Sequence, residues 1–177
     1  MFKTTAHTPL LKVLERLSFA LSSNLRARER KHMKITSQAF TEGGSIPDQY
    51  TMYGQNRIPP LHLDEVPERT RSLALIVDDP DAPSGTFNHW VLFNMDPRIR
   101  DIKENAVPVM ATQGRNDYGE VEYGGPQPPS GEHRYFFRAY ALDTTLPLTR
   151  GTKRQDLERE MKDHVLESAT LMGKYKH

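Results

Sequence analysis

Three short segments of the chain carry the side chains that can do chemistry, and each lies where a predicted strand begins or ends. They are DDPDAP at residues 78–83, FNHW at 87–90 and GGPQPPSGEHRY at 124–135. Together they supply carboxylates, two imidazoles and a phenol, which are groups that bind anions or move protons. The function of the chain depends on whether these three segments meet.

The acidic segment places three carboxylates, those of Asp78, Asp79 and Asp81, within four positions. Like charges this close raise one another's pKa values, so we expect one carboxylate to point inward while its neighbours stay in solvent. Asp and Pro are also common turn formers, and this segment taken alone is better explained by a surface turn.

His89 begins an apolar run, HWVLFNM at 89–95. Side chains alternate along a strand, so Phe87 is expected to share a face with His89 while Trp90 faces the other way. A single histidine in such a position is more often a structural residue than a ligand-binding one.

The third segment joins a stiff Gly/Pro loop to an aromatic strand. Glycine lets a ligand approach backbone N–H groups, and proline lowers the entropy lost on binding by holding the loop in place. His133 and Tyr135 share one face of the strand, whereas Arg134 points the other way and is expected to form a structural ion pair. This arrangement predicts one wall of a preformed anion pocket.

The elements that position these segments are mainly strands. Apolar or alternating runs predict the strands, and Pro- and Gly-rich stretches predict the loops between them. No amphipathic stretch of helical length separates the central strands, which favours an antiparallel β-sandwich over a βαβ fold. The predicted strands are 33–40, 71–79, 89–95 and 134–142, and the predicted loops are 41–50, 80–86, 96–98 and 124–131.

Two peripheral helices are predicted, one at each end of the chain. The first covers 9–31 and is expected to pack on its own domain or on a second subunit. Its apolar face is formed by Leu10, Leu14, Leu17, Leu21 and Leu25. The second is predicted to begin at Thr152 with a capping box completed by Gln155, and to end at Gly173. Its apolar face is formed by Leu157, Met161, Val165 and Ala169.

The composition limits the classes of protein that fit. The 177 residues carry a formal net charge of +1, so no global field draws in nucleic acid or an acidic membrane. The absence of cysteine excludes disulfides and thiol catalysis. No apolar run reaches the roughly 18 residues that span a bilayer, and charges at Lys12, Glu15 and Arg16 argue against a secretory signal peptide. We therefore expect a cytoplasmic protein with a helical extension at 1–32 and one domain at 33–177.

The order and spacing of the three segments resemble those of the phosphatidylethanolamine-binding protein family, in its bacterial Raf-kinase-inhibitor-like branch. Supporting similarity is found in FTEGGSIPDQYT at 40–51 and in the closing MKDHVLESATLMGKY, so that the resemblance runs from Met33 onward. It implies a predominantly β fold, in which a large antiparallel sheet packs on a smaller one, with a few short helices and a small anion pocket at one end.

The resemblance also implies which residues bind the ligand. They are Asp79, Asp81, Phe87, His89, Gly125, Pro128, His133 and Tyr135. Proteins of this family often have a cis peptide bond before the proline that corresponds to Pro83. Many have Trp where this chain has Phe87, which keeps the apolar wall but lacks the indole N–H, so ligand preference need not follow the family.

A physical mechanism follows from that set of residues. Two imidazoles near neutral pH can each gain a proton when an anion arrives, and Asp79 is expected to raise their pKa values and to orient one of them. The N–H groups of the glycine loop and the Tyr135 hydroxyl complete the cradle. Binding of a phosphoryl ligand is then expected to weaken above about pH 7.

These features favour a non-enzymatic binding or regulatory protein for a phosphate- or carboxylate-bearing small ligand, such as a phospholipid head group or a nucleotide-like molecule, or for a phosphorylated or acidic partner. The resemblance alone makes a kinase or protease a candidate target and a homodimer the expected assembly. The alternative is a metal-dependent or acid–base hydrolase that uses Asp79, His89 and His133, although the chain has neither an HExxH nor a GxSxG motif. No cofactor, bound metal, catalytic residue or nucleic-acid partner is predicted.

Overall fold

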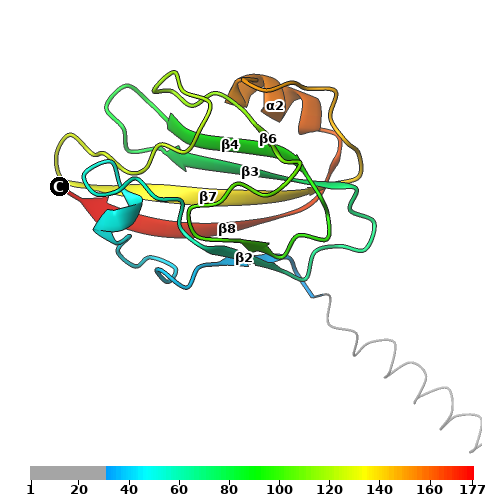
Figure 1. The fold of residues 1–177 in the computed structure, drawn as a ribbon, viewed down its shortest axis with the longest axis horizontal. Helices are drawn as coiled ribbons and strands as arrows, with labels where there is room; N and C mark the ends of the chain where they lie inside the picture. Colours follow the sequence, from blue (N-terminus) through cyan, green and yellow to red (C-terminus); the bar gives the residue numbers. More distant parts are fainter. Residues whose placement is uncertain (1–30) are drawn as a thin grey trace, which may run out of the picture. The chain divides into compact units, whose positions relative to one another are not determined.

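The apolar runs of the sequence form the central strands of a two-sheet structure, seen here in a computed structural model that describes residues 31–177. All pairings within the sheets are antiparallel. The three-stranded sheet has the order β1-β2-β5. The five-stranded sheet has the order β6-β4-β3-β7-β8 (Figure 1). The predicted helix over 9–31 falls on residues outside this description, apart from its last position.

The strands and helices have the following bounds. They are β1 (Lys34–Thr36), the 3-10 helix η1 (Asp48–Tyr50), β2 (Leu61–Asp64), β3 (Ser72–Asp79), β4 (Phe87–Met95), β5 (Asp101–Ile102), β6 (Thr112–Gln113), β7 (Glu132–Leu142), α2 (Arg154–Met161) and β8 (Val165–Lys176). The predicted strands at 71–79, 89–95 and 134–142 correspond to β3, β4 and β7 within two residues, and 33–40 contains the shorter β1.

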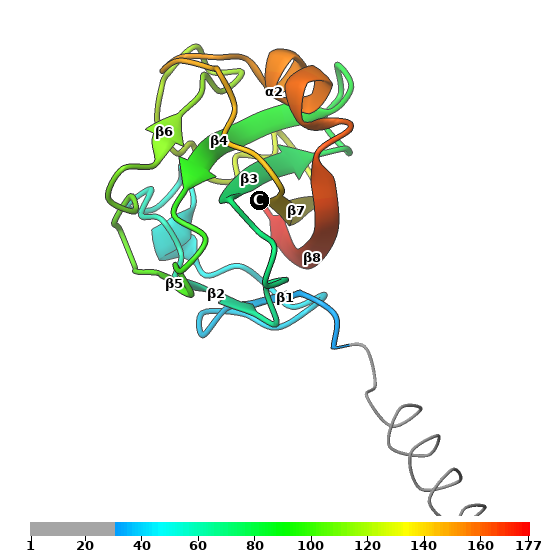
Figure 2. The same cartoon turned by 90° about the vertical axis from the view of Figure 1, so that its right-hand side faces the viewer.

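Two apolar layers hold the fold together, one on each face of the five-stranded sheet. Figure 2 shows α2 on one face of this sheet and β1, β2 and β5 on the other. The layer between the two sheets contains the fully buried Trp90, Tyr135 and Phe137. The layer beneath α2 includes Phe93 and Leu157, neither of which is accessible to solvent. The antiparallel sandwich predicted from the sequence is therefore confirmed.

The strand order brings the chemistry-bearing segments to one end of the large sheet. β3 lies between β4 and β7 and is antiparallel to both, so its last residues meet the first residues of its two neighbours. Asp79 pairs with Phe87, and Asp78 pairs with both Asn88 and Phe136. The end of β3 and the beginnings of β4 and β7 thus converge.

The long C-terminal helix predicted from the sequence is wrong beyond Met161. α2 covers only the eight residues Arg154–Met161, and its N-cap is Lys153 without a side-chain cap hydrogen bond. The Thr152 hydroxyl instead donates to the Thr149 carbonyl at 2.7 Å, so the expected capping box does not form.

The segment Val165–Lys176 is strand β8, which pairs with β7 along its length. Its inward-facing residues include Leu171, Gly173 and Tyr175, at the two-residue spacing of a strand. Gly173 is needed for packing, because an added Cβ would lie 2.6 Å from the Ile46 side chain. None of the helices among residues 31–177 is long and apolar enough to cross a lipid bilayer.

Candidate functional site

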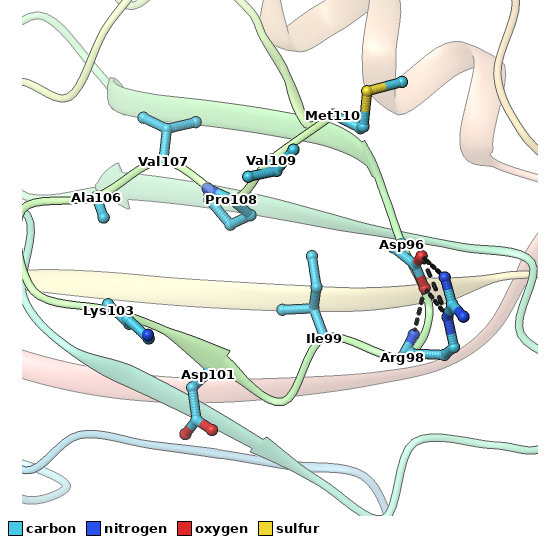
Figure 3. Close-up of a pocket in the computed structure, with 10 residues that line it drawn as sticks. All are labelled: Asp96, Arg98, Ile99, Asp101, Lys103, Ala106, Val107, Pro108, Val109 and Met110. Carbon is cyan, nitrogen blue, oxygen red and sulfur yellow. Dashed lines mark hydrogen bonds and ion pairs between the residues drawn. The ribbon is translucent and has the colours of Figure 1, made fainter.

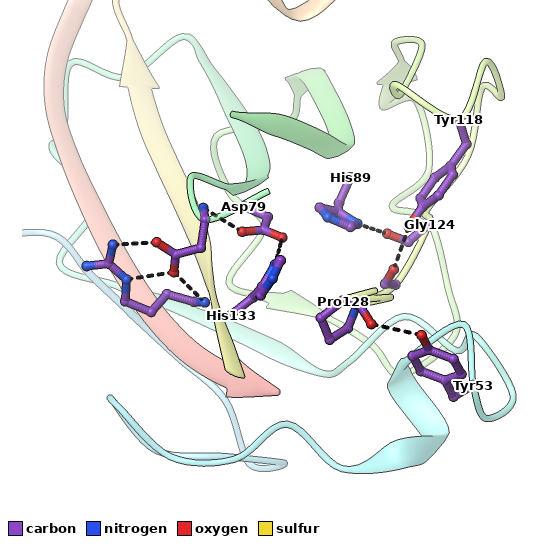
Figure 4. A network of polar contacts seen from close by, with 10 residues as sticks. Tyr53, Asp79, His89, Tyr118, Gly124, Pro128 and His133 are labelled. Atoms are coloured by element: carbon purple, nitrogen blue, oxygen red, sulfur yellow. Dashed lines mark hydrogen bonds and ion pairs between the residues drawn. The ribbon is translucent and has the colours of Figure 1, made fainter. Parts of the chain in front are cut away.

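A cavity of about 270 Å³ lies where β3 ends and β4 and β7 begin. Four of the predicted site residues, Asp79, Phe87, His89 and His133, line it together. The remaining lining residues are Ala82, Pro83, Ser84, Tyr118, Gln127 and Pro129. Residues 54 positions apart therefore share one small site, as the hydrogen bond between Asp79 and His133 shows directly (Figure 4).

Asp79 and His133 form a buried hydrogen-bonded pair at the base of the cavity. The Nδ1–H of His133 donates to Oδ2 of Asp79 at 2.7 Å, while Oδ1 accepts the backbone N–H of Asp81 at 2.8 Å. The two side chains are only 9% and 4% exposed. Because both carboxylate oxygens accept, the proton of a neutral His133 sits on Nδ1, and Nε2 is left for a ligand.

The Nδ1 atom of His89 is already used in a hydrogen bond to the backbone. The Nδ1–H donates to the Gly124 carbonyl at 2.8 Å, which leaves Nε2 as its remaining polar atom (Figure 4). Burial lowers the pKa of His89, and the Gly124 carbonyl and the charge of Asp79 oppose this effect only in part. Asp79 acts to raise the pKa of this imidazole, as expected, but the net shift is downward because desolvation outweighs the charge.

The inward direction of His89 depends on an irregularity of β4. Val77 pairs with Trp90 and Asp78 pairs with Asn88, so His89 is the extra residue of a bulge between the two pairs. Trp90 lies in the layer between the sheets, and the His89 ring packs on Tyr135 of the same layer with centroids 5.2 Å apart. The prediction that His89 and Trp90 face opposite ways is wrong, because the bulge breaks the alternation.

Aromatic side chains form the apolar wall of the cavity. Phe87 packs against His89 with centroids 5.0 Å apart and against the edge of Tyr118 at 4.7 Å. Burial, supported by the charge of Asp79, raises the pKa of Tyr118 to about 12. Gly124 makes room for this ring, because an added Cβ there would lie 2.5 Å from Tyr118. Tyr118 was not predicted, and no local pattern marks it, since its role comes from these long-range contacts.

The other carboxylates of the acidic segment do not face the cavity. Asp81 accepts from Arg134 Nη2 at 2.7 Å and from Arg134 Nε at 2.9 Å, and the bonds to this guanidinium lower the pKa of Asp81 to about 2. The structural ion pair predicted for Arg134 is confirmed, and Asp81 is used in that pair. Asp78 is buried rather than solvated, on the opposite face of the sheet, where it pairs with Arg138 and Arg154. Strand alternation thus separates Asp78 from Asp79.

The Gly/Pro loop at 124–131 forms part of the cavity wall, but it does not offer the expected free N–H groups. The Gly125 N–H already donates to the Asn56 side chain at 2.7 Å, and the Gly124 N–H donates to the His89 carbonyl at 3.0 Å. The Pro128 carbonyl accepts from the Tyr53 hydroxyl at 2.8 Å (Figure 4). The neighbouring residues Gln127 and Pro129, rather than Gly125 and Pro128, line the cavity.

Tyr135 lies behind the cavity wall, completely buried against His89. Its hydroxyl has no hydrogen-bond partner of good geometry among the described residues, although the Gln127 backbone N–H approaches it. Burial raises the pKa of Tyr135, and the charge of Asp79 adds to this effect. Pro83 lines the cavity as well, but residues 31–177 contain no cis peptide bond, so the cis geometry implied before Pro83 is wrong.

Most of this chain matches one known protein family. Residues 36–176 match the family described as phosphatidylethanolamine-binding protein. The chain belongs to the phosphatidylethanolamine-binding protein family.

Relatives of the chain within this family occur in archaea and bacteria. A UPF0098 protein of Methanothermobacter thermautotrophicus is 48% identical over 149 residues, which cover 81% of this chain and 99% of that protein. A UPF0098 protein of Chlamydia muridarum is 43% identical, with coverages of 81% and 98%.

Two crystal structures show the same fold. CT736 of Chlamydia trachomatis, described as a putative phosphatidylethanolamine-binding protein homologue, has a TM-score of 0.80 at 40% identity and covers 82% of this chain and 98% of its own. YbcL of Escherichia coli, described as a new member of the mammalian family, has a TM-score of 0.79 at 28% identity, with coverages of 83% and 99%.

A larger hollow of about 560 Å³ lies away from the histidine cavity and differs from it in chemistry. Figure 3 shows the apolar side chains of Ile99, Val107, Val109 and Met110 around it, with the Asp96–Arg98 ion pair at one side. No histidine lines this hollow. The histidine cavity is therefore the stronger candidate for the site that the family's three motifs build.

The remaining expectations concern metals, activity and partners. Residues 31–177 contain no group of three or more His, Asp or Glu side chains that could hold a metal ion. Neither the family nor the relatives named above indicate an enzymatic activity. The kinase or protease target, the homodimer and the cytoplasmic location stay predictions.

Proposed function

We propose that this member of the phosphatidylethanolamine-binding protein family is a non-enzymatic binding protein whose histidine cavity holds the anionic head of a phosphate- or carboxylate-bearing small molecule. The observation that carries the proposal is the orientation of the two imidazoles. His133 and His89 line one cavity, and each uses Nδ1 on a fixed protein acceptor, so that Nε2 is the atom left for a ligand.

The charges of the cavity favour an anion that arrives together with a proton. Asp79 lies buried below His133, and a bare anion would meet this negative charge unless an imidazole is protonated. An imidazolium at His133 would donate from Nε2 to the ligand while Nδ1 keeps its bond to Asp79. Neutral His89 would accept from the acidic hydroxyl of a monoprotonated phosphate, or donate after taking up a proton itself.

The size of the cavity suits a head group rather than a whole lipid. About 270 Å³ accommodates a phosphate with a short organic substituent. Phe87 and Tyr118 present aromatic surface to that substituent, while a longer chain would extend past the exposed Pro83 and Pro129 into solvent. The protein would also have a regulatory role if a small ligand and a phosphorylated partner competed with each other for this site.

Titration calorimetry with inorganic phosphate and O-phosphorylethanolamine tests the proposal. His133→Asn removes the Nε2 atom and is expected to weaken both ligands about tenfold or more, as loss of a hydrogen bond between charged groups does. His62→Asn is the matched control, because His62 makes the same kind of bond to Asp101 at 2.8 Å but is 48% exposed on the small sheet. Equal affinities in the two variants would contradict the proposal.

The acid–base form of the hydrolase alternative has one feature in its favour, the buried Asp79–His133 pair, which resembles the orienting half of a catalytic triad. No hydroxyl group of the described residues hydrogen-bonds either cavity imidazole, although Ser84 lines the cavity. A screen with p-nitrophenyl esters and phosphates separates the two functions. Turnover that disappears in His89→Ala would replace the binding proposal by the hydrolase.

A further inference from the structure

The loop between β5 and β6 exposes an apolar segment, AVPVMA at residues 106–111. None of these six consecutive residues is buried. Val109 is 83% exposed and Met110 is 85% exposed, whereas no other large apolar residue of the described part of the chain exceeds 41%. A run of this length is normally kept out of solvent, and an exposed one marks a surface that another molecule covers.

The backbone of this loop presents the two side chains at the tip of a turn. The Ala111 N–H donates to the Pro108 carbonyl at 3.1 Å and closes a turn with Val109 and Met110 at its centre. Met110 has a φ of 66°, in the left-handed region where the third residue of such a turn is usually Gly or Asn. Glycine would fit this backbone better and polar residues would suit solvent better, so neither turn geometry nor solubility explains the apolar pair.

The hollow of about 560 Å³ opens beside this turn. Figure 3 shows the side chains of Ile99 and Val107 around it, together with the two residues at the centre of the turn. Cavities of this size hold drug-sized molecules, so the side chains of Val109 and Met110 from another molecule can enter it. One surface of the protein therefore carries both an apolar projection and an apolar hollow.

The charged residues at this hollow balance one another. Asp96 accepts from Arg98 Nη2 at 2.6 Å, and Asp101 bonds to His62 Nδ1 at 2.8 Å. Lys103 lines the hollow as well, so that two carboxylates and two basic side chains surround it. A surface without excess charge does not attract nucleic acid or an acidic membrane. A second copy of the same surface, by contrast, offers residues of both signs for pairing as well as a projection and a hollow that complement the first.

We propose that the chain forms a two-fold symmetric homodimer through this surface, in which the turn at 108–111 of each copy enters the hollow of the other. A two-fold axis brings the same surface of both copies together, so every contact is made twice. The dimer removes Val109 and Met110 from solvent, and burial of apolar surface is the main driving force of most protein association. The hollow shares no lining residue with the histidine cavity, so the dimer can be disrupted without changing that site.

Sedimentation equilibrium of the full chain tests the proposal. The wild-type protein is expected to reach about twice the 20.3 kDa of one chain at micromolar concentrations. Met110→Lys puts a charge into each hollow and Met110→Gly removes the side chain, so both are expected to weaken the dimer about tenfold or more. Met52→Lys is the matched control and is expected to dimerise normally, because Met52 is the other exposed methionine among residues 31–177 and does not line the hollow.

A stability measurement separates loss of the interface from loss of the fold. Glycine adopts a positive φ without strain, so Met110→Gly is expected to unfold in urea at about the wild-type midpoint when both samples are diluted until they are monomeric. A monomeric Met110→Gly with that midpoint supports the proposed interface. Three results would overturn it: a wild-type chain that stays monomeric up to its solubility limit, a dimer that persists in both Met110 variants, and equal weakening in Met52→Lys.

Discussion

The buried Asp79–His133 pair provides a sharp test of how the histidine cavity is built. Asp79→Asn keeps the size of the side chain but replaces one carboxylate oxygen by an NH2 group. The two oxygens now accept from His133 at 2.7 Å and from the Asp81 N–H at 2.8 Å. As long as His133 keeps its proton on Nδ1, either orientation of the new amide loses one of these bonds and sets its NH2 group against a donor.

The cost of the substitution follows from the burial of the pair. Hydrogen bonds to charged groups contribute about 1.5–3 kcal/mol, and side chains that are 4% and 9% exposed cannot exchange the lost bond for water. We expect the free energy of unfolding to fall by about 2 kcal/mol, which lowers the Tm by roughly 4–8 °C for a domain of this size. The affinity for inorganic phosphate should fall as well, because His133 loses its anchoring acceptor.

The matched control is Asp101→Asn. Asp101 accepts from His62 Nδ1 at 2.8 Å, which is almost the same bond, but the two side chains are 66% and 48% exposed. Exposed pairs of this kind contribute about 0–1 kcal/mol. Urea denaturation followed by circular dichroism measures the free energy of unfolding of both variants. An equal loss in the two would show that the buried Asp79–His133 bond contributes no more than the exposed bond and would refute this reasoning.

Two further predictions concern the neighbouring His89 and the C-terminal strand. Burial lowers the pKa of His89 in the free protein, and a bound anion is expected to raise it again. As the pH rises from the pKa of the free protein to that of the complex, the affinity for phosphate should therefore fall about tenfold per pH unit. Calorimetry in buffers of different ionisation enthalpy should then detect proton uptake, and its absence would exclude this linkage. Gly173→Ala should cost about 1–3 kcal/mol by overpacking against Ile46. Ser168→Ala, on an exposed part of the same strand, should change the free energy of unfolding by less than about 0.5 kcal/mol, and similar losses in both would argue against the packing of β8.

The C-terminal region shows where sequence periodicity misleads. Leu157 and Met161 do lie on the buried side of α2, but Val165 and Ala169 continue their four-residue spacing inside a strand. The same segment also has an alternating pattern that ends in Tyr175, and the sequence alone does not choose between the two. Pairing with β7 favours the strand, because without β8 the hydrogen-bonding groups along one edge of β7 would stay unpaired.

The sequence determined the central strands, and its resemblance to the family named four residues that line the histidine cavity. A strand buried on both faces must be apolar throughout, so 71–79 and 89–95 were visible as continuous runs. Asp79, His89 and His133 lie at the ends of predicted strands, but the residue pattern alone favoured a turn for the acidic segment and a structural role for His89, and only the resemblance assigned the three to one site. The alternation of side chains also separated His133 from Arg134 correctly, because that rule is local to one strand.

Only the tertiary structure decided which of these groups is free to act. The bulge that turns His89 inward arises from the pairing of β4 with β3, and the N–H of Gly125 is occupied by the distant Asn56. Desolvation by surrounding chain reverses the expected direction of the His89 pKa shift. Strand periodicity depends on neighbouring residues alone, whereas hydrogen-bond satisfaction and burial depend on every segment that folds against a site, and for that reason they emerge only when the whole chain is in place.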